Sequence, residues 1–159
     1  MALAIRPARP GDAALVVQFV RELAEYEKLS HECETTEAMI DQALFSASPR
    51  LFCDIAEWDG APVGNAVWFL NFSTFTGRHG IYLEDLFVRP AFRHKGIGKA
   101  LMVNLAQRCV AQGWTRFEWS VLDWNTPSIE FYRSIGAQLK AEWTICRVSG
   151  DALKRLAGR

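Results

Sequence analysis

The sequence lacks long apolar runs, and it lacks an excess of charge of either sign. No stretch approaches the roughly 20 consecutive apolar residues that span a bilayer, and no charged-then-apolar leader is recognisable. The 18 Lys and Arg residues equal the 18 Asp and Glu residues, which argues against a nucleic-acid binder held by phosphate neutralisation. We therefore expect neither a membrane nor a nucleic acid as a partner.

Cysteine and histidine are also scarce, and neither is spaced as metal sites require. The cysteines lie far apart and form no C-x-x-C pair, and the histidines form no i, i+4 pair. We expect no metal, and we interpret the cysteines as free thiols in a reducing cytoplasm. The residues concerned are Cys33, Cys53, Cys109, Cys146, His31, His79 and His94.

The apolar content, by contrast, is sufficient for one sizeable core. Half of the 159 residues are hydrophobic, so we expect a single domain over residues 1–159. Apolar residues that alternate or recur at helical spacing predict its elements, with Asp12 and Thr126 as helix caps. Strands are expected near 5–7, 51–58, 63–72, 81–88, 117–121 and 141–148, and helices at 13–26, from Thr35 or Thr36 to Phe45, at 97–112 and after Thr126. This order predicts an α/β (α+β) fold with a mixed, mostly antiparallel central sheet flanked by helices.

The segment from Tyr82 to Ala100 carries the clearest chemical signal. It predicts an apolar strand, a short turn, and a glycine-containing loop that opens directly into a helix. A helix N-terminus presents backbone N–H groups to an anion, and Gly96 and Gly98 remove the Cβ atoms that would hold a phosphate away. Arg93, Lys95 and Lys99 add positive charge. We therefore predict a pyrophosphate site.

Two familiar phosphate loops do not fit this spacing. A Walker A loop needs Ser or Thr after its Gly-Lys pair, but Ala100 follows Gly98-Lys99. A dinucleotide fingerprint needs a third glycine where Leu101 stands. What remains is an Arg-x-x-Gly-x-Gly loop after a strand, which resembles the coenzyme A loop of the GCN5-related N-acetyltransferases (GNAT).

A second segment extends this resemblance. Ser120–Tyr132 contains a strand end, an asparagine and a helix with a Phe-Tyr pair, and Gly136-Ala137 follows. The chain is most similar to the diamine branch of the superfamily, the spermidine/spermine and thialysine N-acetyltransferases, from about Ile5 onward. The segments that carry this similarity are 21–29, 81–85, 121–125 and 154–159. It implies a GNAT fold, acetyl-CoA as co-substrate and a homodimer.

The resemblance also implies roles for individual residues. Tyr132 would be the general acid that protonates the coenzyme A thiolate, since a phenol with a pKa of about 10 stays protonated at neutral pH. Glu84 would contact the amine and help to remove its proton. The residues implied in cofactor binding are Leu86, Phe87, Val88, Arg93, His94, Lys95, Gly96, Ile97, Gly98, Lys99, Asn125 and Ser128. Those implied in substrate binding are Tyr26, Glu27, Glu84 and Glu142.

Several of these residues also have purely structural interpretations. Strand alternation sends Glu84 and Asp85 to opposite faces unless a bulge intervenes, so we interpret Asp85 as a structural carboxylate. Phe131 and Tyr132 could both pack their helix on the sheet. Asn125 could be a turn residue before Pro127, alone or in addition to a cofactor contact.

These observations favour an acetyl-CoA-dependent N-acetyltransferase that acts on a small primary amine by direct transfer in a ternary complex. Seven acidic residues occur from Glu22 to Asp41, both included. Most should form a solvated face, and they would also suit a cationic amine. Thialysine, diamines and polyamines are the expected substrates. A protein or peptide N-acetyltransferase remains an alternative, and a non-catalytic acyl-CoA-binding module is a third.

Overall fold

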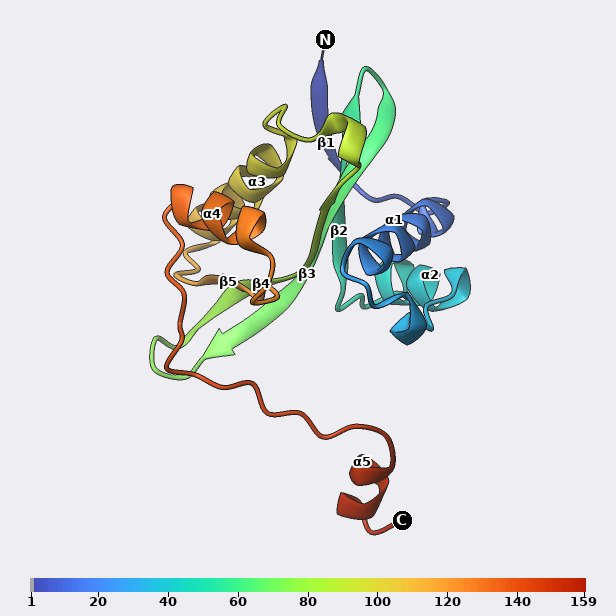
Figure 1. Cartoon of the computed structure of the whole chain (residues 1–159), viewed down its shortest axis with the longest axis vertical. Coiled ribbons are helices and arrows are strands. Elements are labelled where there is room, and N and C mark those ends of the chain that lie inside the picture. The colour runs from blue at the N-terminus through green and yellow to red at the C-terminus, as the bar shows by residue number, and fades with distance from the viewer. Residues whose placement is uncertain (1) are drawn as a thin grey trace. The chain divides into compact units, whose positions relative to one another are not determined.

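The structure, a computed structural model, describes residues 2–159, which form two compact units. The first ends at Ser120 and the second comprises Val121–Arg159. The first unit is built on a five-stranded sheet whose strands follow the order of the chain (Figure 1). These strands are β1 (Leu3–Pro7), β2 (Phe52–Trp58), β3 (Ala61–Ser73), β4 (Arg78–Val88) and β5 (Phe117–Trp119).

The sheet is mixed, as the sequence predicts. Neighbouring strands from β1 to β4 are antiparallel, and β5 runs parallel to β4. A parallel neighbour requires a crossover connection, which α3 (Ile97–Gln112) provides. The predicted hairpin at Asp59-Gly60 is confirmed: both residues have positive φ, 50° and 82°, as a two-residue turn between twisted strands prefers.

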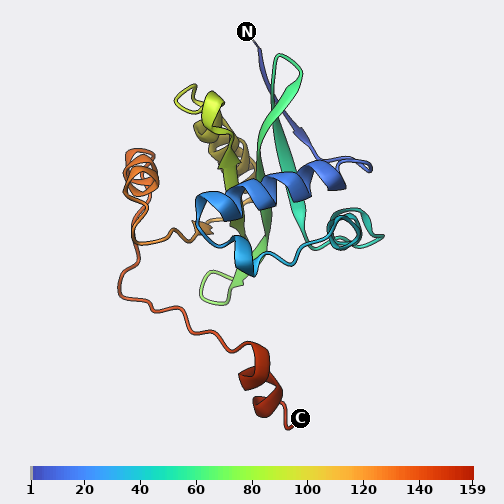
Figure 2. The same ribbon diagram turned by 45° about the vertical axis from the view of Figure 1, so that its right-hand side comes forward.

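Helices cover both faces of this sheet. Figures 1 and 2 show α1 (Ala13–Tyr26) and α2 (Glu37–Phe45) over one face and α3 over the other. Apolar side chains of α1, α2 and the sheet form the core on the first face. Its buried residues include Val16, Val17, Ile40, Leu44, Ile55 and Val67. On α3, Leu101 and Leu105 are fully buried, and Gly113 ends the helix in the left-handed conformation.

The two predicted helix caps each contain one error. Asp12 is the N-cap residue of α1, as predicted, but its carboxylate makes no cap hydrogen bond to the helix; it accepts from Arg6 Nη1 and from the Arg9 N–H, each at 2.7 Å. The bond from Arg6 holds the pKa of Asp12 below its ordinary value. In α4 (Thr126–Ser134) the cap is Asn125 and not Thr126. Both errors arise because several polar residues near a helix start compete for the same role.

The second unit contains α4 and the short helix α5 (Gly150–Leu156), and its remaining residues form no strand. The strand predicted at 141–148 is therefore wrong. Every residue of the connecting segment 138–149, which we call the C-terminal arm, is exposed. Alternation of apolar residues reports a preference for extended backbone, but a strand exists only where a neighbour completes its hydrogen bonds. Among residues 2–159, no helix has the length and apolar content to cross a membrane.

Candidate active site

A β-bulge in β4 places two carboxylates side by side. Val67 of β3 pairs with Asp85, while the next residue, Trp68, pairs with Leu83. Glu84 is therefore the extra residue of the pair of strands, and a bulge of this kind re-aims side chains that simple alternation would separate. The exception allowed from the sequence, a bulge, therefore applies here, and simple alternation does not separate Glu84 from Asp85.

Both carboxylates line one pocket of about 340 Å³ in the first unit. Its walls come from α1, from the connection between α1 and α2, from α2, from the residue before β2, and from β3 and β4. The acidic lining residues are Glu27, Glu32, Glu84 and Asp85, and the apolar ones include Val20, Leu23, Leu29, Ile40, Leu51 and Val67. Apolar walls with a few converging charges are typical of a small-molecule site. A pocket of this composition suits a cation on a short aliphatic chain.

Asp85 is the most strongly perturbed acid in this pocket. Burial, together with the nearby Glu84 and Glu27 carboxylates, raises the pKa of Asp85 to about 7. Burial also raises the pKa of Glu27. A carboxyl group in a pocket, with a pKa close to neutral pH, is a candidate proton acceptor. From the sequence alone we interpret Asp85 as a structural carboxylate, because the adjacent acids are visible in the sequence but the bulge is not.

The same shift predicts that Asp85 destabilises the folded protein. Its folded-state pKa of about 7 exceeds the unfolded value of about 3.9, so stability falls as pH rises between these values. Full conversion of the shift gives about 4 kcal/mol; because Asp85 retains some solvent contact, we expect Asp85→Asn to stabilise by about 1–3 kcal/mol at pH 8. At pH 4 the gain should vanish. Urea unfolding at both pH values measures it, and an Asp85→Asn protein less stable at pH 8 than wild type contradicts it.

The predicted phosphate loop has the conformation that an anion site needs. His94 and Gly96 both have positive φ, 62° and 79°, and Gly96 is the N-cap of α3. The first intrahelical bond runs from Ala100 N–H to Gly96 O at 2.9 Å, so the preceding N–H groups lack intrahelical acceptors. A Cβ at Gly96 would meet no heavy atom within 4 Å, so this side of the loop is open to a ligand.

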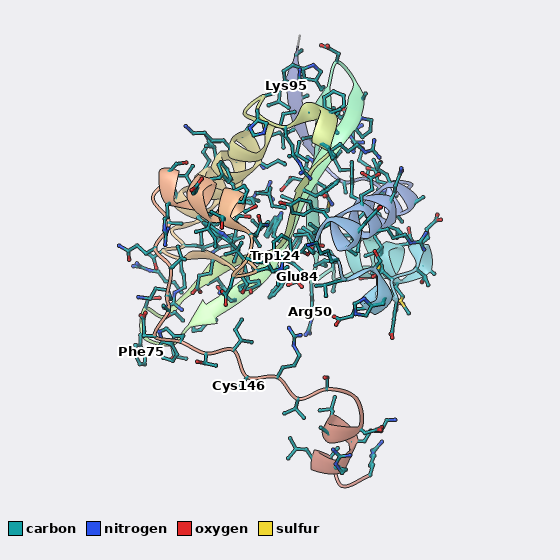
Figure 3. The ribbon with its side chains drawn as sticks, viewed as in Figure 1. Arg50, Phe75, Glu84, Lys95, Trp124 and Cys146 are labelled. Carbon is teal, nitrogen blue, oxygen red and sulfur yellow. The ribbon has the colours of Figure 1, made fainter. Side chains whose placement is uncertain are left out.

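Side chains of this loop differ in where they lie. Ile97 is 1% exposed, so only its backbone could meet a phosphate. His94, Lys95 and Lys99 are exposed, and Figure 3 shows Lys95 on the loop before α3. The Lys95 ammonium lies 5.4 Å from the centre of the Trp58 ring. Lys95 and Lys99 therefore leave exposed positive charge around the N-terminus of α3.

The end of β4 provides backbone groups next to this loop. In the described part of the chain, β5 pairs with Ile81–Leu83 only, while β3 pairs with β4 as far as Val88. One edge of β4 from Glu84 to Val88 therefore has no strand partner, and this edge includes Leu86, Phe87 and Val88, which the resemblance implies in cofactor binding. On the other edge, a Cβ at Gly64 would collide with the Phe87 carbonyl oxygen, so glycine permits β3 to lie close here.

Tyr26 and Glu27 take different positions at the end of α1. Glu27 lines the pocket with Glu84 and Asp85, as its predicted substrate role requires. The Tyr26 ring lies under the Arg93 guanidinium, 4.6 Å from centroid to Cζ. Arg93 Nε donates to the Val88 carbonyl at 2.9 Å, so the Arg93 side chain faces α1 and β4.

The remaining predicted site residues belong to the second unit. Asn125 is buried, and its Oδ1 accepts from the Ser128 N–H at 3.4 Å. Tyr132 lies on α4 with its ring 5.4 Å from that of Phe131. Glu142 lies on the arm, and its ion pair with Lys140 at 2.8 Å lowers its pKa. The roles predicted for these residues stay predictions.

Comparison with known sequences finds acetyltransferase relatives. A model of the Acetyltransferase (GNAT) family matches residues 17–137. A thialysine N-epsilon-acetyltransferase of Mus musculus is 37% identical, and the match covers 98% of this chain and 97% of the relative. The L-ornithine N5-acetyltransferase NATA1 of Arabidopsis thaliana is 29% identical, with 96% and 86% coverage.

Solved structures share the fold. An integron cassette protein from the mobile metagenome of V. cholerae has a TM-score of 0.83 and 27% identity, and the match covers 100% of this chain and 99% of that one. AAC(6')-Iy, solved with a bisubstrate analogue of coenzyme A, has a TM-score of 0.75 at 19% identity, with 94% and 100% coverage. The second similarity is one of fold alone.

Proposed function

The chain belongs to the GNAT acetyltransferase family, and from that premise we propose that it transfers the acetyl group of acetyl-CoA to a primary amine of a small molecule. Thialysine, lysine-like amino acids, diamines and polyamines form the proposed substrate class. The observation that carries this proposal is the pocket in which Glu27, Glu84 and Asp85 converge. The names of the thialysine and ornithine acetyltransferases support the same class.

The pocket suits both parts of such a substrate. Its carboxylates attract an ammonium group from solution, and the low polarity of its walls strengthens that attraction. The apolar side chains of Val20, Leu23 and Leu51 would cover a short methylene chain. A free ammonium cannot attack a thioester, so the amine must lose a proton inside the pocket.

Acetyl-CoA fits the loop and strand that precede α3. The backbone N–H groups from Gly96 to Lys99 would hold the pyrophosphate, and the unpaired edge of β4 would hold the pantetheine arm. Bound acetyl-CoA supplies the activated acetyl group as a thioester. For Asn125 and Ser128 of the second unit, the proposed contact with the cofactor rests on the resemblance alone.

The proposed reaction is one direct displacement. The amine proton passes to a carboxylate of the Glu84-Asp85 pair, and the amine nitrogen forms a bond to the acetyl carbon. The C–S bond breaks, and the departing thiolate takes a proton from Tyr132. The nitrogen then loses its second proton, which returns Tyr132 to its neutral form, and the proton on the carboxylate is released to solvent. The net reaction converts an ammonium and a thioester into an amide, a thiol and one proton.

A homodimer and a cytoplasmic location complete the proposal. Trp143 and Ile145 of the arm are 77% and 73% exposed, and apolar side chains exposed together favour association. Light scattering should give twice the chain mass of 17.9 kDa; a single species at the chain mass excludes the dimer. The free cysteines support a reducing compartment.

The experiment that tests the function is coenzyme A release from acetyl-CoA by purified protein. Thialysine, lysine, ornithine, putrescine, spermidine, spermine and a peptide amine would be offered separately. We expect turnover with one or more small amines and little with the peptide. Turnover with the peptide alone would favour a protein acetyltransferase, and binding without any turnover would favour a non-catalytic module.

A further inference from the structure

Two arginines frame the short turn between β4 and the phosphate loop, and both reach across to α1. The turn is the 3-10 helix η2 (Pro90–Phe92), with Arg89 before it and Arg93 after it. Their partners on α1 are Phe19, Glu22 and Tyr26, which are spaced by three and four residues and so lie on one face of the helix. The phosphate loop is thus attached to the helix that ends at the amine pocket.

Arg89 holds the turn to α1 through several hydrogen bonds. Its Nε and Nη2 donate to the two carboxylate oxygens of Glu22 at 3.1 and 3.0 Å. Its Nη1 donates to the Pro62 carbonyl at 3.0 Å, and its guanidinium lies 4.8 Å from the centre of the Phe19 ring. A paired fork of this kind fixes both distance and orientation.

Arg93 makes the second contact with α1, and it lies next to both proposed ligand sites. Its Nε donates to Val88 at the end of β4, where the pantetheine arm would bind. Its guanidinium lies over Tyr26, at 4.6 Å, and over Phe87, at 5.8 Å. Tyr26 is followed directly by Glu27, which lines the amine pocket. One side chain therefore contacts the proposed cofactor strand and the residue next to an amine-pocket acid.

We propose that Arg93 is a positioning residue that couples coenzyme A binding to the amine pocket through its contact with Tyr26. The inference depends on the proposed function for the identity of the two ligands. When acetyl-CoA binds the loop, it holds Arg93 in place, and Arg93 in turn fixes the end of α1 and Glu27. The coupling is reciprocal, so the state of Tyr26 must affect the affinity for coenzyme A.

A double-mutant cycle tests this coupling, with calorimetric affinity for coenzyme A as the readout. Arg93→Gln and Tyr26→Leu should each weaken coenzyme A binding by about 3- to 10-fold, the range of a cation–π contact. The double variant should bind coenzyme A with the same affinity as the single variant that binds it less tightly, because both changes remove the same contact.

Lys95→Gln is the matched control, because it removes another cation of the same loop whose side chain lies over Trp58. Its loss of affinity should add to that of Tyr26→Leu. If Arg93 acts only on the phosphate, Tyr26→Leu leaves the affinity for coenzyme A unchanged. The losses of affinity from Arg93→Gln and Tyr26→Leu are then additive in the double variant. Either result overturns the proposal. If Arg93→Gln does not fold, as urea unfolding would show, Arg93→Lys replaces it in the cycle.

The outcomes separate this inference from the proposed function. Normal turnover with an additive cycle overturns the coupling alone. Binding without turnover, together with a non-additive cycle, supports the coupling and counts against the enzyme. A wild type that does not bind coenzyme A counts against both.

Discussion

Replacing Tyr132 by Phe should lower kcat by about 100- to 1,000-fold at neutral pH, the usual contribution of a positioned general acid. The substitution removes one hydroxyl from α4 and leaves the ring beside Phe131, so packing of the helix should change little. The departing thiolate would have to take its proton from water. Steady-state coenzyme A release with the preferred amine measures the loss, and the KM values for both substrates should change by less than kcat.

Tyr82→Phe is the control, since it is the same chemical change at a position outside the proposed machinery. The Tyr82 hydroxyl shares a hydrogen bond of 2.8 Å with Ser120 Oγ at an exposed position, and its loss should leave kcat within about threefold of wild type. Equal losses in the two variants, or an active Tyr132→Phe enzyme, would remove Tyr132 from the mechanism.

Removing the pocket carboxylates should have the second large effect. We expect Asp85→Asn and Glu84→Gln each to lower kcat/KM for the amine by about 10- to 100-fold, and the double variant by more. A carboxylate accepts a proton only when it is ionised, and the pKa of Asp85 is raised to about 7. The wild-type rate should therefore rise with pH through about 7, and Asp85→Asn should lose that limb of the profile.

Glu25→Gln is the matched control for loss of one negative charge. Glu25 is an exposed residue of α1, and its variant should keep both the rate and the pH profile. If the rate of Asp85→Asn still rises with pH through about 7, the group that titrates in this range is not Asp85. A loss confined to KM, with kcat preserved, would show that the pair only binds the ammonium.

The two properties of Asp85 are linked. The surroundings that raise its pKa towards the range of a useful base also make its ionised form costly to bury. We therefore expect Asp85→Asn to be more stable and less active at pH 8. Such opposition between stability and activity is common where a site holds a strained or unsolvated group.

Local patterns in the sequence determined the elements that hold this site. Helical spacing of Leu101, Leu105 and Cys109, with a glycine at each end, predicted α3 and the loop before it, because such signals depend on neighbouring residues only. The same is true of the hairpin at Asp59-Gly60 and of the mixed sheet. The resemblance in the loop and in the Asn125–Tyr132 segment pointed to the family that the comparisons then showed.

Only the tertiary structure decided how the side chains of the site are arranged. The bulge that joins Glu84 to Asp85 depends on the register between β3 and β4, and register is set by contacts between strands distant in sequence. The contact of Arg93 with Tyr26 joins residues 67 positions apart (93 minus 26), which no local pattern encodes. The arm shows the converse: its alternating residues suit a strand, but strand formation requires a partner that the sequence alone does not specify.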